Sequence, residues 1–250
     1  MPTNLAQPAD RRGANLGWMT GLTIAEQLVL VAYDPQRRRV TGGPTVYQAA
    51  AGAVVMDLFL AGACEMRDGH LVTAAETPAG GPLLAAAAAT IAAEPRLREI
   101  KHWVRHLAAP RFRPGQPVLA SLVSAGVLRP VTLPWLGVFK RQGHELADQG
   151  TRDQLVAGVR SALLSSAIPD APMASLLALL STCGLVDRAV SREERGPARK
   201  RAASIARGDV VGEAVSAVIR EVQAEVMTAV IVATMASSTV DGGGGAGHAH

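Results

Sequence analysis

The sequence predicts a mainly helical fold, namely a single helical-bundle domain that carries two small β-hairpins. Hydrophobic residues make up 48% of the 250 residues, yet aromatic residues make up only 3%. Small aliphatic side chains let helices pack closely, whereas β-sandwiches favour aromatic and β-branched side chains. Helix-capping signals precede several apolar segments, and only two segments carry the turn residues that are typical of hairpins.

The first predicted helix begins at a capping box and is followed by an arginine-rich loop. Thr23 and Glu26 stand three residues apart, in the T-x-x-E pattern that caps helix N-termini. We expect this helix to run to about Tyr33. The loop that follows, residues 34–43, contains three consecutive arginines: Arg37, Arg38 and Arg39.

The second predicted helix is apolar almost all round, as expected of a helix at the centre of a bundle. Pro44 occupies its first turn, and the helix ends near Gly62. It contains Asp57, which we expect to pair with an arginine or to cap a backbone N–H of a hairpin rather than to act as a catalytic acid. After the helix, an Asp-Gly pair between short alternating runs predicts a hairpin over residues 65–72.

Three further helices are predicted at about residues 83–93, 97–107 and 117–124. His102 and His106 stand four residues apart on the second of these, a spacing that can hold a metal ion. The intervening sequence lacks the H-E-x-x-H pattern, so we expect two exposed histidines. Between the second and third helices lies a loop with a phenylalanine between two arginines: Arg111, Phe112 and Arg113.

Residues 127–147 form the second predicted hairpin, whose apolar centre is marked as a turn by proline and glycine. Its central apolar side chains are Leu133, Trp135, Leu136, Val138 and Phe139, with Arg129, Lys140 and Arg141 nearby. An apolar wedge with basic neighbours suits a bilayer interface, where burial and attraction to headgroups add. Two other placements stay open, a self-association surface and packing on the core.

The last third of the chain predicts more helices and a basic segment. A second capping box begins at Thr151, and Pro172 opens a helix that runs to about residue 185. The basic stretch at residues 192–207 is capped at its start and interrupted at residues 196–197. Asp209 caps the final helix, which carries valines at helical spacing.

No internal repeat or long linker divides the chain, so we expect one domain over residues 21–240. Residues 1–20 predict a flexible tail, and residues 241–250 predict a disordered Gly/His-rich tail. No signal peptide is evident, and no apolar stretch reaches the roughly 20 residues that span a bilayer. The two cysteines lie outside any C-x-x-C pair, and we expect buried free thiols. These features predict a cytoplasmic protein with peripheral membrane contact.

The charge of the chain favours anionic partners. The net charge is +4, and 25 residues are Lys or Arg, with a pI of about 9.6. Nearly all of these are arginine, which binds phosphate as a planar fork. The sequence shows no glycine-rich phosphate loop, no G-x-S-x-G elbow and no set of nucleophile, base and oxyanion donors. We therefore expect no enzymatic activity, no cofactor and no metal site.

Several segments, taken in order, resemble the Golgi phosphoprotein 3 family. Residues 22–30 (LTIAEQLVL) are similar to the family's L-T-x-x-E-E-L-L-L-L start, and residues 56–62 (MDLFLAG) to its L-x-E-L-A-L-R-G helix end. Further similar segments follow in the same order: residues 77–84 (TPAGGPLL), Trp103, residues 124–128 (SAGVL) and residues 176–180 (LLALL). The resemblance covers roughly residues 20–235.

The resemblance implies a mostly helical domain with a hairpin that supports membrane insertion or self-association. The family's eukaryotic members are peripheral Golgi proteins that bind phosphatidylinositol 4-phosphate and tails of glycosyltransferases. Their headgroup pocket uses one Trp and several Arg. Carried onto this sequence, the Trp falls at about Gly42 or Gly43 and the Arg fall at Ala51 and at about Phe112 and Gly115, so none is retained. Five nearby arginines offer a phosphate site of another shape: Arg37, Arg38, Arg39, Arg111 and Arg113.

Together these features predict a peripheral membrane protein that binds anionic phospholipid headgroups, by resemblance phosphatidylinositol 4-phosphate. Its hairpin is expected to insert into the membrane or to form a homo-oligomer. The alternative is a nucleic-acid-binding or regulatory helical module that uses residues 192–207, although no recognition-helix motif supports nucleic acid as a partner. A third interpretation, an enzyme or metabolite-binding accessory protein, requires a closed pocket with convergent polar groups.

Overall fold

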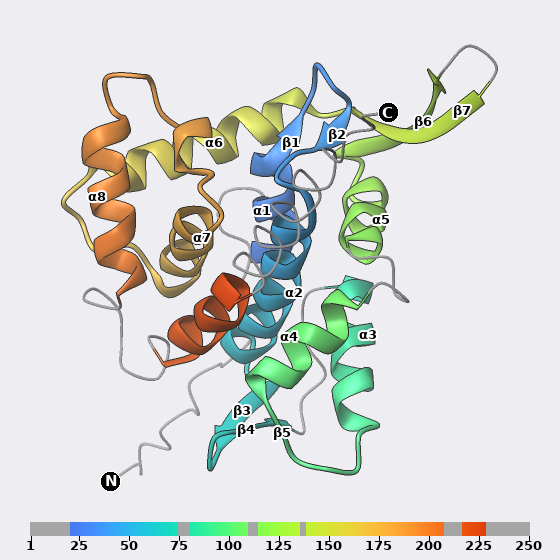
Figure 1. Cartoon of the computed structure of the whole chain (residues 1–250), viewed down its shortest axis with the longest axis vertical. Coiled ribbons are helices and arrows are strands. Elements are labelled where there is room, and N and C mark those ends of the chain that lie inside the picture. Colours follow the sequence, from blue (N-terminus) through green and yellow to red (C-terminus); the bar gives the residue numbers. More distant parts are fainter. Residues whose placement is uncertain (1–20, 75–80, 110–114, 136–138, 208–216, 229–250) are drawn as a thin grey trace, which may run out of the picture.

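The computed structural model describes residues 21–74, 81–109, 115–135, 139–207 and 217–228. These residues form a mainly helical fold with small antiparallel strand groups, as predicted (Figure 1). At its centre lie α1 (Ile24–Ala32) and α2 (Gly43–Leu60). To one side in the view of Figure 1 lie α3 (Gly81–Ala92), α4 (Ile100–Ala108) and α5 (Gln116–Ser124), and to the other α6 (Gln149–Leu164), α7 (Ala171–Thr182) and α8 (Arg195–Ala206).

Helix α1 is buried along its whole length and is capped from two directions. The predicted capping box is confirmed, because the Thr23 hydroxyl accepts a hydrogen bond from the Glu26 N–H at 3.2 Å and the Glu26 carboxylate accepts one from the Thr23 N–H at 2.8 Å. The N–H groups of Ile24 and Ala25 donate to the Asp57 carboxylate at 2.9 and 3.2 Å. Asp57 in α2 therefore caps a helix, whereas the sequence had suggested a hairpin or an arginine as its partner.

A glycine in α2 lets the helical segment at residues 217–228 pack closely. A Cβ built on Gly52 would lie 2.3 Å from Val222 Cγ1, a distance that real contacts do not show. The same segment is tied to α4, because Arg105 Nη2 donates to the Glu225 carboxylate at 2.9 Å. The described part of the last predicted helix is thus confirmed, while its predicted cap at Asp209 lies outside the described residues.

The strands form three small antiparallel groups within the described residues, one more than the two hairpins that were predicted. The first predicted hairpin consists of β3 (Cys64–Arg67) and β4 (His70–Thr73), to which β5 (Arg98–Glu99) adds a third strand. The second consists of β6 (Leu128–Trp135) and β7 (Phe139–Leu146). Figure 1 shows β6 and β7 extending away from the helices.

The additional pair joins β1 (Tyr33–Asp34) to β2 (Arg39–Val40), in the segment that was predicted to be a loop. The Asp34 carboxylate accepts hydrogen bonds from two backbone N–H groups of the turn at 2.9 and 3.1 Å. Arg38 closes the turn with a φ of 50°, a conformation that few residues other than glycine adopt. This local hydrogen bonding holds the strands together although the segment lacks alternating apolar residues.

Three predictions about the N-terminal parts of helices differ from the structure. Helix α6 is capped by Asp148, whose carboxylate accepts the Thr151 N–H at 3.0 Å, so the capping box predicted to begin at Thr151 is wrong. Helix α4 begins at Ile100 rather than near residue 97, because residues 98–99 pair with β4. Helix α8 is not interrupted at residues 196–197, because that Gly-Pro pair lies in its first turn, where proline is tolerated.

A single hydrophobic cluster runs through the described residues from Leu22 to Val226, and Trp103 is among its largest fully buried side chains. Cys64 and Cys183 are both free, as predicted. Burial raises the pKa of Cys64 to about 11 and that of Cys183 to about 12, so both remain thiols. None of the described helices combines the length and the apolar character that a bilayer crossing requires.

Candidate functional site

The turn between β1 and β2 presents three arginines to solvent. Arg37, Arg38 and Arg39 are all exposed. Arg37 Nε lies 3.8 Å from Asp34 Oδ2, which is a loose ion pair. The Arg37 backbone N–H is the main cause that lowers the pKa of Asp34 below its ordinary value, with the Gln36 N–H and the Arg37 charge adding to it. Asp34 therefore acts as a carboxylate that fixes the turn.

A fourth arginine reaches the same place from the second hairpin. Arg141 in β7 is the cross-strand partner of Leu133 in β6. Together with the turn, these residues enclose a shallow hollow of about 470 Å³, which we call the arginine hollow. Its lining residues are Gln36, Arg37, Arg38, Arg39, Leu133, Pro134 and Arg141.

Gly143 leaves room for the Leu133 side chain beside the β1–β2 turn. A Cβ on this glycine would lie 2.7 Å from Leu133 Cδ1 and 3.4 Å from the Arg38 carbonyl oxygen. Beside it, the Tyr33 hydroxyl donates a hydrogen bond to the His144 carbonyl oxygen at 2.7 Å, across 111 residues of sequence. Burial raises the pKa of Tyr33 and lowers the pKa of the His144 ring. Both side chains are therefore uncharged at neutral pH, and the arginines supply the charge of the hollow.

The arginines of the hollow are largely unneutralised. Within the described residues, no carboxylate lies at ion-pairing distance from Arg38, Arg39 or Arg141. Arg129, which was expected to support the apolar centre of the hairpin, instead donates to the Glu145 carboxylate across the ladder at 3.0 Å. Clustered guanidinium groups without counter-charges create a positive potential, and their planar donors match phosphate or carboxylate oxygens.

The structure brings together part of the predicted lipid-binding set. Arg37, Arg38 and Arg39 meet Leu133 of the predicted membrane hairpin, which joins the two sets in one place. The backbones of Trp135 and Phe139 form the last pair of the ladder. The remaining predicted site groups lie outside the described part of the chain: Arg111, Arg113, Leu136, Val138 and the side chains of Trp135 and Phe139.

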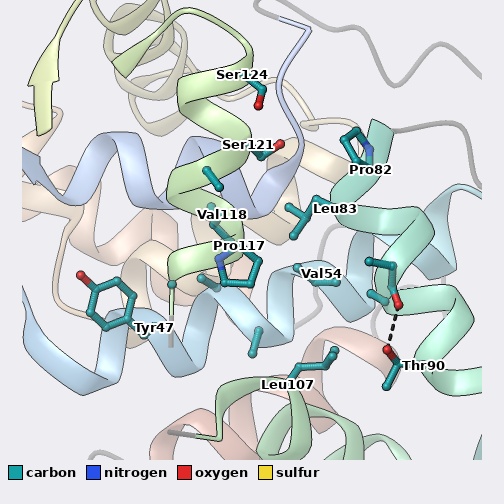
Figure 2. A pocket seen from close by; sticks show the side chains of 16 residues that line it. Tyr47, Val54, Pro82, Leu83, Thr90, Leu107, Pro117, Val118, Ser121 and Ser124 are labelled. Carbon is teal, nitrogen blue, oxygen red and sulfur yellow. Dashed lines mark hydrogen bonds between the residues drawn. The ribbon is translucent and has the colours of Figure 1, made fainter. Parts of the chain in front are cut away.

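A second region is an apolar cavity of about 480 Å³ between α2, α3 and α5 (Figure 2). Its walls include Tyr47 and Val54 from α2, Leu83 from α3 and Val118 from α5. None of the described residues that line it is an acid, a histidine, a lysine or an arginine. The sequence does not predict this cavity, because small side chains on three separate helices leave no pattern along the chain.

The cavity includes two positions onto which the family's headgroup residues were carried. Ala51 and Gly115 both line it, and neither carries a polar side chain. Gly42 and Gly43 begin α2 with φ values of 94° and 59°, where a tryptophan side chain would be strained. Phe112 lies outside the described residues. Among the described residues, the cations available for a phosphate therefore line the arginine hollow, and none lines this cavity.

The other candidates from the sequence have structural partners. Asp57 is fully buried, and burial raises its pKa to about 7 although two backbone N–H groups oppose this shift. His102 and His106, which were expected to be exposed, are half-buried, and their rings stack with centroids 5.8 Å apart. Among the described residues, no group of three or more potential ligand side chains is placed to hold a metal ion.

The basic stretch at residues 192–207 is used largely within the fold. Arg199 Nε donates to the Asp187 carboxylate at 2.7 Å, and Arg195 Nε lies 3.4 Å from the same carboxylate. Arg201 donates to the Ala167 carbonyl oxygen at 2.7 Å. These contacts tie α8 to the short 3₁₀ turn at Val186–Arg188 and to the segment before α7.

The fold and the site together define a mainly helical protein whose exposed arginines gather beside a projecting hairpin. Residues 24–222 match the family described as Golgi phosphoprotein 3 (GPP34), a span that extends from the start of α1 into the helical segment at residues 217–228. The chain belongs to this family, as its sequence resemblance predicted. No curated protein matches the chain at a significant level.

Proposed function

We propose that the protein is a peripheral, non-enzymatic membrane protein of the cytoplasm that binds anionic phospholipid headgroups in the arginine hollow. The observation that carries this proposal is the meeting of four exposed arginines with Leu133 and Pro134, close to the tip end of a projecting hairpin. Membership of the Golgi phosphoprotein 3 family supports it, since the family resemblance implies phosphatidylinositol 4-phosphate as the lipid.

The chemistry of the hollow suits a phosphate at a membrane surface. Arg39 and Arg141 come from different hairpins, so their guanidinium groups can approach one headgroup from two sides. Each basic side chain near an anionic leaflet adds about 1 kcal/mol of attraction, so removing two should weaken binding by roughly 10- to 30-fold at low salt. The hairpin tip then adds apolar burial in the interface.

Vesicle co-sedimentation tests the proposal. Vesicles of phosphatidylcholine alone, with phosphatidylglycerol, or with phosphatidylinositol 4-phosphate at the same surface charge form the panel. We expect weak binding to the neutral vesicles and strong, salt-sensitive binding to both anionic sets. A preference for the phosphoinositide at matched charge would support the specific lipid. Equal binding to neutral and anionic vesicles, or to none of them, would reject the proposal.

A charge-matched pair of variants assigns binding to the hollow. Arg39→Gln/Arg141→Gln removes two charges from the hollow, and Arg96→Gln/Arg192→Gln removes two from exposed sites outside it. The first variant should bind anionic vesicles roughly 10- to 30-fold more weakly, and the second within about threefold of wild type. Equal losses would mean that net charge, rather than the hollow, attracts the membrane.

The nucleic-acid alternative gains no support from the basic stretch, because Arg195, Arg199 and Arg201 are engaged by α8's neighbours. Homo-oligomerisation through the hairpin stays a prediction. Sedimentation velocity with and without vesicles would detect it, and a monomer under both conditions would speak against it.

A further inference from the structure

We infer that the cavity between α2, α3 and α5 is a second binding site, which takes one unbranched alkyl chain with an uncharged head. The part of its lining that the structure describes contains no charged side chain, and most of that wall is alanine, valine, leucine and proline (Figure 2). Apolar cavities accept apolar ligands because binding removes apolar surface of both the protein and the ligand from water without breaking hydrogen bonds. This site is distinct from the arginine hollow and does not depend on lipid binding there.

The size of the cavity fits a chain rather than a small ring. A volume of about 480 Å³ lies within the usual range for ligand sites, and it is about three times a cavity that holds benzene. On that scale, and with partial filling, an alkyl chain of roughly ten to twelve carbons fits. Ala50 and Ala51 from α2 and Ala86 and Ala87 from α3 leave this space open because their side chains are short.

The wall at one end is built by a close approach of Tyr47 to Gly115. A Cβ on Gly115 would lie 2.1 Å from Tyr47 Cδ1, and the glycine has a φ of 82°. Any other residue at this position would displace the ring. Burial raises the pKa of Tyr47, so its hydroxyl, which Figure 2 shows pointing away from the other lining side chains, carries no charge at neutral pH.

The polar groups of the cavity favour a neutral head over a charged one. The Thr90 hydroxyl donates to the Ala86 carbonyl oxygen at 2.8 Å, as the dashed line in Figure 2 shows. Its proton is therefore already hydrogen-bonded and does not require an acceptor on the ligand. Ser121 and Ser124 from α5 bring hydroxyl groups to another edge of the cavity. A hydroxyl head can exchange hydrogen bonds with serine, whereas a phosphate head would meet no cation among the described lining residues.

Fluorescence of the uncharged probe N-phenyl-1-naphthylamine tests the inference in vesicle-free buffer. Wild-type protein should enhance the probe's emission, and 1-decanol should displace it. Decyl phosphate should displace the probe at least 10-fold less effectively than 1-decanol. No enhancement with wild type, or stronger displacement by decyl phosphate than by 1-decanol, would overturn the assignment.

Matched alanine substitutions locate the site. Ala86→Phe on α3 and Ala120→Phe on α5 add a ring at exposed positions that line the cavity, and Ala89→Phe adds one at an exposed position of α3 that does not. Either cavity variant that retains wild-type circular dichroism should bind the probe at least 10-fold more weakly, and Ala89→Phe should stay within about twofold of wild type. Unchanged binding by a folded cavity variant would place the probe elsewhere.

Discussion

Replacing Asp57 by asparagine should remove a pH dependence from the stability of the fold. Asp57 is fully buried, and its carboxylate accepts the N–H groups of Ile24 and Ala25 at the start of α1. Burial is the largest influence on this group and raises its pKa from 3.8 to about 7. The folded chain therefore keeps a proton on Asp57 at pH values where the unfolded chain has already released it.

The sign and size of the effect follow from this difference. Between the unfolded pKa of 3.8 and the folded pKa of about 7, the folded state binds more protons, so the free energy of unfolding falls as the pH rises through this window. Lowering the pH from about 8 to about 5 should raise the free energy of unfolding by about 2 to 3 kcal/mol through Asp57 alone. Asparagine has nearly the same shape and keeps one acceptor oxygen, but it does not titrate.

Urea unfolding followed by circular dichroism at several pH values measures this contribution. The difference between wild type and Asp57→Asn cancels the titration of other groups. One of these is His144, whose lowered pKa makes the folded state less stable as the pH falls. The difference in unfolding free energy should therefore change by about 2 to 3 kcal/mol between about pH 5 and pH 8. Parallel pH profiles for the two proteins would refute the reasoning.

Three further variants test contacts that position the helices and the site. Gly52→Val should clash with Val222 and lower stability by about 1 to 3 kcal/mol, and a wild-type melting temperature would show that residues 217–228 adjust freely. Gly143→Val should displace the Leu133 side chain, which lines the arginine hollow, and weaken anionic-vesicle binding severalfold with little change in helical content, so unchanged binding would contradict the assembled hollow. Trp135→Ser/Phe139→Ser should weaken vesicle binding at high as well as low salt, since it removes apolar burial. Unchanged binding would mean that the hairpin tip stays out of the interface.

Most of the fold could be predicted from the sequence because its signals are local. The capping box at Thr23 and Glu26 lies within one turn of helix, so the residues that predict it in the sequence are also the residues that form its hydrogen bonds in the structure. The turn residues of the hairpin that joins β3 to β4 are likewise adjacent in the chain. Where a competing local interaction existed the prediction failed, as at Asp148, which caps α6 in place of Thr151.

The site was harder to predict because it is made by tertiary contacts. The arginine triplet is visible in the sequence, but it meets Arg141 through tertiary contacts such as the hydrogen bond from Tyr33 to His144, which spans 111 residues. Asp57 shows the same limit, since the helix that it caps lies more than 30 residues away. A buried carboxylate requires a hydrogen-bonding or ionic partner, but its burial alone does not indicate which residue that partner is.

One proposed site is charged and the other is apolar, so a change in ionic strength should affect ligand binding at the two sites differently. The arginine hollow offers exposed guanidinium groups, and attraction between exposed charges and a membrane is screened over about 8 Å at physiological salt. The cavity lined by Ala51 and Gly115 has no charged side chain among its described residues. The transfer of an alkyl chain into it therefore does not rely on Coulomb attraction. Raising sodium chloride should therefore weaken binding to anionic vesicles while probe binding in the cavity stays constant. If both fell together, the two ligands would share one electrostatic site, and the separation of the two regions would have no functional meaning.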